Sequence, residues 1–199
     1  MIEQLILVRH GETVHNVAGI AQGWNDSTLS DRGEQQVSRL AERLRALDFD
    51  TVYSSPLGRA LATAEKIARP RDLPIATDDD LREMSYGRWE GRSFLDVRRE
   101  DEQSYQNWIT RGDAGCPEGE SHDDVRARLE RAFARISAES RRPVVVSHGT
   151  AIRIAATALL GLPVMTARHF AQDNASMSVF LWRIDRWVLK SWNDVTHCS

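Results

Sequence analysis

Three short runs of aliphatic and β-branched residues, each followed by a stretch with helical character, limit the folds open to this chain. Such runs are typical of strands in a mostly parallel sheet, because helices cover both faces of that sheet. The alternation predicts an α/β fold: a three-layer α/β/α sandwich with a mostly parallel mixed sheet. The runs are QLILV, TVYS and PVVVS, at residues 4–8, 51–54 and 143–147.

Helix signals lie between these runs. Ser30 is expected to cap a helix that ends at about Leu47, and Ser55-Pro56 to open another that ends at about Ala68, since Ser suits the N-cap and Pro the first helical turn. Residues 1–199 are expected to form a single domain. The other expected segments are a functional loop at 11–29, a loop at 81–92, a small helical insert at about 93–120 over the active site, helices at 121–139 and 150–160, and a hairpin at 176–184 and 187–192.

Composition excludes several classes of function. The net charge of −3 gives no general attraction for nucleic acid or a membrane, so an anionic ligand needs a local cluster of cations. Cys116 and Cys198 lie far apart in sequence and are expected to be reduced thiols rather than a disulfide or a zinc site. The apolar run at 4–8 is too short for a signal peptide or a membrane span, and we expect a cytoplasmic protein.

Polar residues follow each of the three strands and are expected to meet at one edge of the sheet. Arg9 and His10 follow the first strand, Arg59 lies a helical turn beyond the second, and His148 follows the third. In open α/β sheets, ligands bind outside the carboxyl ends of the strands. Helix N-termini at that edge also favour a phosphate group.

These residue types suit phosphoryl transfer. A neutral imidazole is a nucleophile near neutral pH, and two guanidinium groups can bind the equatorial oxygens of a phosphoryl group. We therefore predict that His10 attacks the phosphorus atom and forms a phosphohistidine, while a general acid protonates the leaving oxygen.

Two alternatives compete with this interpretation. Arg9 and His10 at a strand end could simply be solvated, and His10 with His148 could bind a metal. No zinc-ligand spacing accompanies these histidines, and the neighbouring arginines would repel a metal ion, so no metal and no cofactor are expected. The remaining histidines match no motif and are expected to be surface or packing residues: His15, His122, His169 and His197.

The same segments resemble the motifs of the histidine phosphatase superfamily, which includes cofactor-dependent phosphoglycerate mutases. The resemblance covers nearly the whole chain, and the order of the motifs is specific. The matching segments are LVRHGET at 7–13, Asn16, Gln22-Gly23, LSDRG at 29–33, SSPLGRA at 54–60, LRE at 81–83, GRWEG at 87–91, PEGES at 117–121 and SHG at 147–149.

The resemblance implies a role for each site residue. His10 would carry the phosphoryl group, Arg9, Arg59 and His148 would bind it, and Glu83 would protonate the leaving oxygen and then activate water. Without the family, the simpler interpretation of Glu83 is a solvated carboxylate in a charged loop. The residues implied to contact the substrate are Asn16, Gln22, Gly23 and Gly149.

The family contains both mutases and phosphatases, and the residues favour a phosphatase here. Mutases typically have an Arg directly after the acidic residue, where this chain has Met84, and they carry a longer, basic insert. The insert here is short and has an acidic run at 100–102, with Arg98-Arg99 as the counter-indication; these two arginines are expected to line a solvated face. We predict a metal-independent phosphatase acting on phosphate monoesters of small metabolites. A mutase and a non-catalytic phosphate-binding module on the same fold are the alternatives.

The substrate is not specified by these residues. The chain resembles broad-specificity, α-ribazole and phosphoserine phosphatases alike. The expected partner is a small-molecule phosphate monoester, not nucleic acid or a membrane, and a homodimer is left open. Four aromatic residues could either contact the organic leaving group of the substrate or pack in the core: Trp24, Trp89, Tyr105 and Trp108.

Overall fold

Strands of the chain form one sheet at the centre of the molecule. The computed structural model describes residues 2–198. The strands are β1 (Gln4–Arg9), β2 (Thr51–Ser54), β3 (Ile75–Thr77), β4 (Pro143–Ser147), β5 (Met177–Arg183) and β6 (Arg186–Asp194). Within the described residues their order is β3-β2-β4-β1-β5-β6. β1, β2, β3 and β4 pair in parallel, and β5 and β6 are antiparallel additions at one edge, which confirms a mostly parallel mixed sheet.

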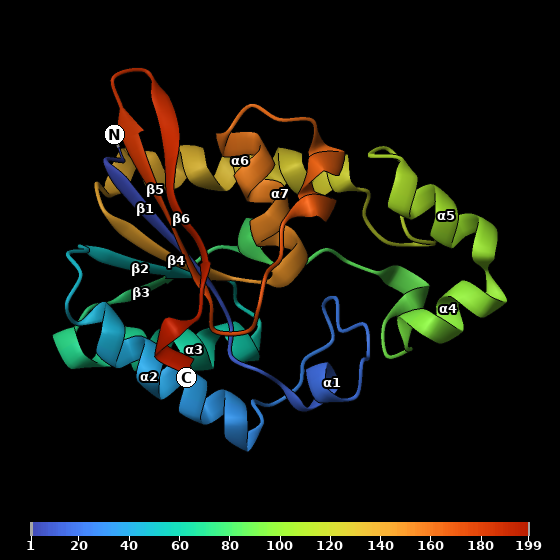
Figure 1. Ribbon diagram of the computed structural model, residues 1–199, viewed down its shortest axis with the longest axis horizontal. Coiled ribbons are helices and arrows are strands. Elements are labelled where there is room, and N and C mark those ends of the chain that lie inside the picture. Colours follow the sequence, from blue (N-terminus) through green and yellow to red (C-terminus); the bar gives the residue numbers. More distant parts are fainter. Residues whose placement is uncertain (1, 199) are drawn as a thin grey trace.

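Helices cover both faces of this sheet (Figure 1). They are α2 (Asp31–Leu44), α3 (Gly58–Ala68), α6 (His122–Glu139) and α7 (Gly149–Leu159). Successive residues of β1 point to opposite faces: Ile6 and Val8 pack in the core under α2 and α3, while Leu5 and Leu7 pack in the core under α6 and α7. The predicted three-layer sandwich is therefore confirmed.

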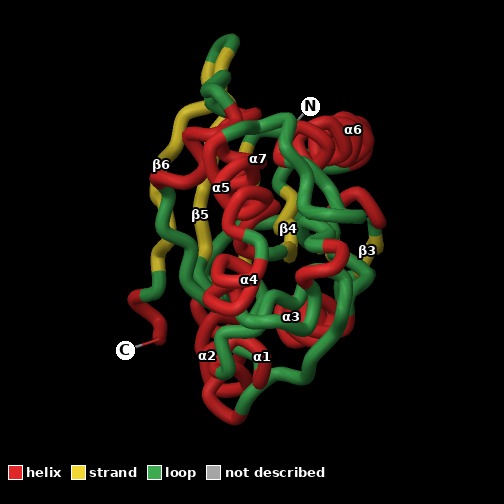
Figure 2. The backbone as a smooth tube through the Cα atoms, turned by 90° about the vertical axis from the view of Figure 1, so that its right-hand side faces the viewer, coloured by secondary structure: helices red, strands yellow, loops and turns green. Residues whose placement is uncertain are grey.

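Two short helices, α4 (Phe94–Glu100) and α5 (Glu102–Thr110), lie beside the body of the molecule. Figure 2, which views the molecule from the right-hand side of Figure 1, shows them in front of the sheet, near the edge where the parallel strands end. The helical insert expected at about 93–120 therefore consists of two short helices.

The start of α3 differs from the prediction. Ser55-Pro56 does not open the helix; the N-cap is Leu57, whose side chain makes no capping bond. Asp26, in the loop before α2, takes over the capping role: its carboxylate accepts hydrogen bonds from the backbone N–H groups of Gly58 and Arg59. A side chain distant in sequence thus replaces the local cap, and that contact cannot be read from the helix itself.

Two small elements were not predicted. β3 is only three residues long and pairs with β2. The expected loop at 11–29 contains a single helical turn, α1 (Val14–Val17), which Thr13 and Asn16 close with a capping box. Ser30 caps α2, as predicted, by accepting from the Gly33 N–H at 3.0 Å.

Two expectations from composition can be compared with the structure. Cys116 and Cys198 are free thiols, and Cys116 is buried. Between residues 2 and 198, no helix is both long enough and apolar enough to cross a membrane.

Candidate active site

A cleft of about 240 Å³ lies where β1 and β4 end and α7 begins. Every predicted site residue except His148 lines it: Arg9, His10, Asn16, Gln22, Gly23, Arg59, Glu83 and Gly149. Residues from five separate parts of the chain thus meet at the carboxyl edge of the sheet, as expected for an open α/β fold. Further residues that line the cleft were not predicted from the sequence: Ile20, Ala21, Tyr86, Phe94, Thr150, Arg153 and Gln172.

His10 is fixed by its position directly after β1. Its backbone N–H donates to the Ser147 carbonyl oxygen at 3.1 Å, and its own carbonyl oxygen accepts from the Ala175 N–H at 3.0 Å. The ring Nδ1 lies 2.7 Å from the carbonyl oxygen of Gly11. Because a carbonyl oxygen can only accept, Nδ1 carries the proton, and Nε2 keeps its lone pair.

The surroundings also keep the His10 ring neutral. Burial holds the pKa of His10 well below its usual value of 6.5, and the positive charges of Arg59 and Arg9 lower it further. The hydrogen bond to Gly11 opposes this shift but is the smallest of these effects. In the free protein, His10 is therefore a neutral imidazole at neutral pH.

Arg59 comes from the first turn of α3 and is 2% exposed. Its Nη2 donates to the Gly23 carbonyl oxygen at 2.7 Å and its Nη1 to that of Asn25 at 2.9 Å, while Asp26 lies 3.3 Å from Nη1. Its Nε has no hydrogen-bond partner within residues 2–198. The guanidinium is thus held rigidly and keeps an N–H group for a ligand.

Arg9, the last residue of β1, is held in a similar way. Its Nη1 donates to the carbonyl oxygen of Gln172, and its Nε has no partner in the described chain. Gly149 packs against the guanidinium so closely that a Cβ there would lie 3.3 Å from the Arg9 Cζ. A larger residue at position 149 would require the Arg9 guanidinium to shift by a few tenths of an ångström, which gives the sequence His148-Gly149 a steric reason.

His148 lies beside His10 rather than in the lining of the cleft. The two ring centroids are 5.2 Å apart, and His148 is fully buried. Its Nε2 lies 2.8 Å from the Ser55 hydroxyl, and its Nδ1 has no partner among the residues described. Burial, followed by the charge of Arg59, holds the pKa of His148 well below its usual value. His148 is thus a second neutral imidazole next to the first.

Glu83 lies against the N-terminus of α7 and is 8% exposed. Its Oε2 accepts from the Thr150 N–H at 3.1 Å, and its Oε1 from the N–H groups of Ala151 and Met84 at 3.0 and 2.9 Å. Glu83 is therefore a buried, oriented carboxylate, not the solvated side chain that composition favours.

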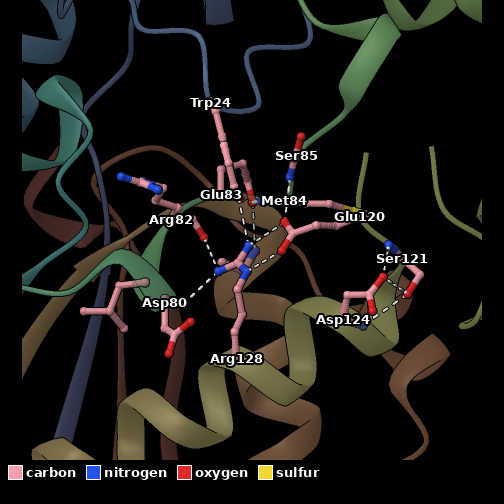
Figure 3. Close-up of polar contacts among 12 residues, drawn as sticks. Trp24, Asp80, Arg82, Glu83, Met84, Ser85, Glu120, Ser121, Asp124 and Arg128 are labelled. Carbon is pink, nitrogen blue, oxygen red and sulfur yellow. Dashed lines mark hydrogen bonds and ion pairs between the residues drawn. The ribbon is translucent and has the colours of Figure 1, made fainter. Parts of the chain in front are cut away.

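Arg128 holds the loop that carries Glu83 (Figure 3). This buried residue of α6 donates from Nη1 to the carbonyl oxygens of Asp80 and Arg82, both at 2.8 Å, and from Nη2 to that of Glu83 at 2.9 Å. It also forms a two-pronged ion pair with Glu120, at 2.7 and 2.9 Å. Arg128 thus fixes the backbone on which Glu83 stands.

Arg128 was not predicted from the sequence, although its position in the helix carries a signal. Arg128 lies on the face of α6 that also carries Val125, Leu129, Ala132 and Ile136, all of them buried. An arginine among apolar residues at this spacing has to find buried partners.

The aromatic residues singled out from the sequence do not form the wall of the cleft. Trp89 is 2% exposed and packs in the core, whereas Trp24 is 44% exposed and donates to the Glu83 carbonyl oxygen at 2.8 Å. Tyr105 and Trp108 belong to an aromatic cluster beside the cleft. The aromatic lining of the cleft comes instead from Tyr86 and Phe94.

The charged residues of the insert also lie outside the cleft lining. Glu100 pairs with Arg92, and Asp101 caps α5. Arg98 and Arg99 are exposed on α4, in agreement with a solvated face. Neither the acidic run nor this arginine pair therefore contacts a molecule bound in the cleft.

The fold and the cleft together define an α/β protein with an arginine-lined cleft at the carboxyl ends of its parallel strands. The family model of the histidine phosphatase superfamily (branch 1) matches residues 5–195, and the chain belongs to this family. The resemblance proposed from the motifs is confirmed.

Proteins named as mutases and proteins named as phosphatases are both similar to this chain over nearly its full length. A Shigella boydii protein named "Probable phosphoglycerate mutase GpmB" is 36% identical over 203 residues, 98% of this chain and 94% of that protein. The structure of α-ribazole phosphatase from Shigella flexneri matches with a TM-score of 0.87 and 32% identity, covering 96% of each chain. Phosphoserine phosphatase from Entamoeba histolytica, in complex with 3-phosphoglyceric acid, matches with a TM-score of 0.85 and 32% identity, covering 98% of this chain and 99% of that one.

Proposed function

We propose that the protein is a metal-independent phosphatase that hydrolyses phosphate monoesters of small metabolites through a phosphohistidine on His10. The observation that carries this proposal is the orientation of His10. Its Nδ1 proton is bound by the Gly11 carbonyl oxygen, which leaves the Nε2 lone pair for a phosphorus atom held between Arg9 and Arg59.

The proposed reaction has two steps. In the first, the Nε2 lone pair of His10 forms a bond to phosphorus, the P–O bond to the alcohol breaks, and Glu83 gives its proton to the leaving oxygen. In the second, the Glu83 carboxylate takes a proton from water, the hydroxide attacks phosphorus, and the N–P bond breaks to release inorganic phosphate. Arg9, Arg59 and His148 stabilise the charge on the transferring phosphoryl oxygens in both steps.

Two features favour hydrolysis over mutase chemistry. Met84, at the position where mutases typically carry an Arg, is fully buried, so no cation reaches the cleft from there. The insert contains only the short helices α4 and α5, and of these only Phe94 lines the cleft. Water should therefore reach the phosphohistidine. Asn16, Gln22, Gly23 and Gly149 would shape the phosphate end of the cleft.

The deciding experiment compares two activities of the purified protein. We expect release of inorganic phosphate from a panel of phosphate monoesters to exceed isomerisation of 3-phosphoglycerate in the presence of 2,3-bisphosphoglycerate. Isomerisation faster than hydrolysis of every panel member would make the protein a mutase. Phosphate binding with neither activity would make it a binding module.

We expect hydrolysis to be independent of divalent metal ions, because Arg9 and Arg59 supply the positive charge that Mg²⁺ supplies in other phosphoryl-transfer enzymes. The measurement is the rate with p-nitrophenyl phosphate before and after dialysis against EDTA. Vanadate and free phosphate should inhibit, since both suit an anion site. A rate that falls in EDTA and returns with one divalent ion would contradict the proposal.

Replacing Arg128 by Met is expected to reduce kcat by roughly 10- to 100-fold, because the backbone that carries Glu83 loses its anchor. Leaving Glu120 without its partner should also lower the free energy of unfolding by about 3–5 kcal/mol. If Arg128 acts through Glu83, the loss of kcat should be larger for an alkyl phosphate than for p-nitrophenyl phosphate, which has a good leaving group.

Arg126→Met is the matched control for this prediction. Arg126 lies on the same helix but pairs with Glu130, away from the Glu83 loop. The Arg126→Met variant should have the wild-type kcat for both the alkyl phosphate and p-nitrophenyl phosphate. Equal losses on the two substrates in Arg128→Met would assign Arg128 a purely structural role.

A further inference from the structure

The turn that precedes β5, at residues 172–176, lies directly against the segment that carries the nucleophile. The Ala175 N–H donates to the His10 carbonyl oxygen at 3.0 Å, and the Ser176 carbonyl oxygen accepts from the Arg9 N–H at 3.1 Å. Ala175 is fully buried and adopts the left-handed conformation, with a φ of 55°. A residue other than glycine keeps this uncommon conformation where the surrounding contacts hold it. The course of the turn is therefore fixed, and its side chains have defined positions.

Asn174, in this turn, faces three acceptor atoms beside the active site. Its Nδ2 lies 3.3 Å from the His10 carbonyl oxygen, 3.4 Å from that of Gly11, and 3.1 Å from Asn16 Oδ1. Because a carbonyl oxygen can only accept, the atom of the Asn174 amide that faces these groups is the nitrogen. Asn16 consequently presents its oxygen, and not its nitrogen, to Asn174.

Thr13 requires the same orientation of the Asn16 amide. The Thr13 backbone N–H donates to Asn16 Oδ1 at 3.1 Å, and the Thr13 hydroxyl donates to the same oxygen at 3.0 Å. This hydroxyl accepts from the Asn16 backbone N–H at 3.1 Å, so its own proton is available for Oδ1. With Oδ1 occupied by these donors and by Asn174, Nδ2 is the end of the Asn16 amide that is left for the cleft, which Asn16 lines.

The orientation of this amide decides whether Asn16 attracts or repels a phosphoryl group. The Nδ2 group is a donor and suits an anionic oxygen, whereas the amide oxygen is an acceptor and would repel it. Thr13 and Asn16 belong to the same short loop and can move together. Asn174 instead ties the Asn16 amide to the turn before β5, and hence to the backbone of His10.

We propose that Asn174 is a positioning residue: it holds the Asn16 amide with Nδ2 toward the cleft, so that Asn16 donates to an oxygen of the phosphoryl group beside His10. This inference rests on the proposed function, because it takes the cleft to be the phosphoryl site. Asn174 does not itself line the cleft, so it acts through Asn16 and not by contact with the substrate.

A double-mutant cycle, measured as affinity for inorganic phosphate, tests the proposal. Asn16→Ala should weaken phosphate binding by about tenfold or more, since a hydrogen bond to a charged group is lost. Asn174→Ala should weaken it by about three- to tenfold in the wild-type background but by less than about twofold in Asn16→Ala, because the amide that Asn174 orients is then absent. The measurement is titration calorimetry, with thermal unfolding to establish that each variant is folded.

Asn174→Asp provides a second measurement at nearly constant side-chain size. A carboxylate cannot donate to Asn16 Oδ1 and instead attracts Nδ2, which would turn the donor end of the amide away from the cleft. This variant should therefore weaken phosphate binding by a larger factor than Asn174→Ala does, and by a smaller factor once Asn16 is replaced by alanine.

Asn193→Gly is the matched control. The Asn193 side chain holds the same turn, but it does so through Asp173: it accepts from the Asp173 N–H and donates to the Asp173 carboxylate, both at 2.7 Å. The φ of 51° at Asn193 suits glycine, so the substitution removes the side chain without straining the backbone. Any change in phosphate affinity should be the same factor with and without the Asn16 side chain.

The cycle separates a failure of this proposal from a failure of the proposed function. An equal effect of Asn174→Ala in both backgrounds, or unchanged affinity in Asn174→Ala or in Asn16→Ala, would overturn the role of Asn174. Hydrolysis of phosphate esters by the wild-type protein would stand in each of these cases. The expected coupling in phosphate affinity, in a wild-type protein that hydrolyses no ester, would establish Asn174 as a positioning residue and remove the phosphatase assignment.

Discussion

Replacing His10 by alanine is expected to reduce hydrolysis of every phosphate monoester by at least about a thousandfold, because the proposed route has no other nucleophile. The phosphorus atom would remain bound between Arg9 and Arg59, so affinity for free phosphate should survive the substitution. The measurement pairs steady-state rates with phosphate binding by calorimetry and with thermal unfolding. A folded, phosphate-binding and inactive protein is the expected result.

The intermediate can be observed directly in the wild-type protein. Rapid quenching at alkaline pH should trap a phosphohistidine that is stable to base and lost in acid, and His10→Ala should yield none. His169→Ala is the matched control, since His169 is exposed and should be dispensable. Hydrolysis by His10→Ala within about tenfold of the wild-type rate would exclude the phosphohistidine route.

The low pKa of His10 adds a pH dependence to this prediction. A histidine whose pKa is lowered stays neutral, and hence nucleophilic, as the pH falls through 6.5. The acid limb of kcat/KM should therefore show no loss of the nucleophile between pH 8 and pH 6.5. The measurement is kcat/KM as a function of pH, with a substrate whose own pKa values are known so that its ionisation can be separated from that of the protein.

Local signals carried most of the fold prediction. β2 and β4 begin and end at the predicted residues, because a short run of strand-forming residues bounded by polar ones is enough to locate a buried strand. β3 was not predicted because three residues are too few to show an alternation of apolar and polar side chains. Its position is set by its pairing with β2. The predicted first residue of α3 was wrong because Asp26, which is distant in sequence, caps the helix.

The site shows the same division. His10, Arg59 and His148 could be expected together because each follows a strand whose end must lie at the same edge of the sheet. Glu83 came from the family motif alone, since the loop that carries it has no regular period and side chains distant in sequence, the buried Arg128 among them, fix its course. Arg153, which also lines the cleft, was missed because the sequence of a helix does not show which of its residues will face a ligand.

The second large effect is expected for Glu83→Gln, and it should depend on the leaving group. For alkyl phosphates, whose leaving oxygen needs a proton, we expect a loss of about a hundred- to ten-thousandfold in kcat, the range typical of general acid catalysis. For p-nitrophenyl phosphate the leaving oxygen hardly needs a proton, so the first step should be nearly unchanged. The measurement is a plot of log kcat against leaving-group pKa, which should be steeper in the variant.

Glu90→Gln distinguishes this effect from a disturbance of the loop. Glu90 accepts backbone N–H groups, among them those of Trp24 and Tyr86, much as Glu83 does with those of α7, but it does not line the cleft. The Glu90→Gln substitution should change kcat by a similar factor for all substrates, because Glu90 acts on the loop and not on the leaving oxygen. If Glu83→Gln instead slows aryl and alkyl esters equally, Glu83 holds the cleft in shape. In that case the proton for the leaving oxygen must come from another group or from water.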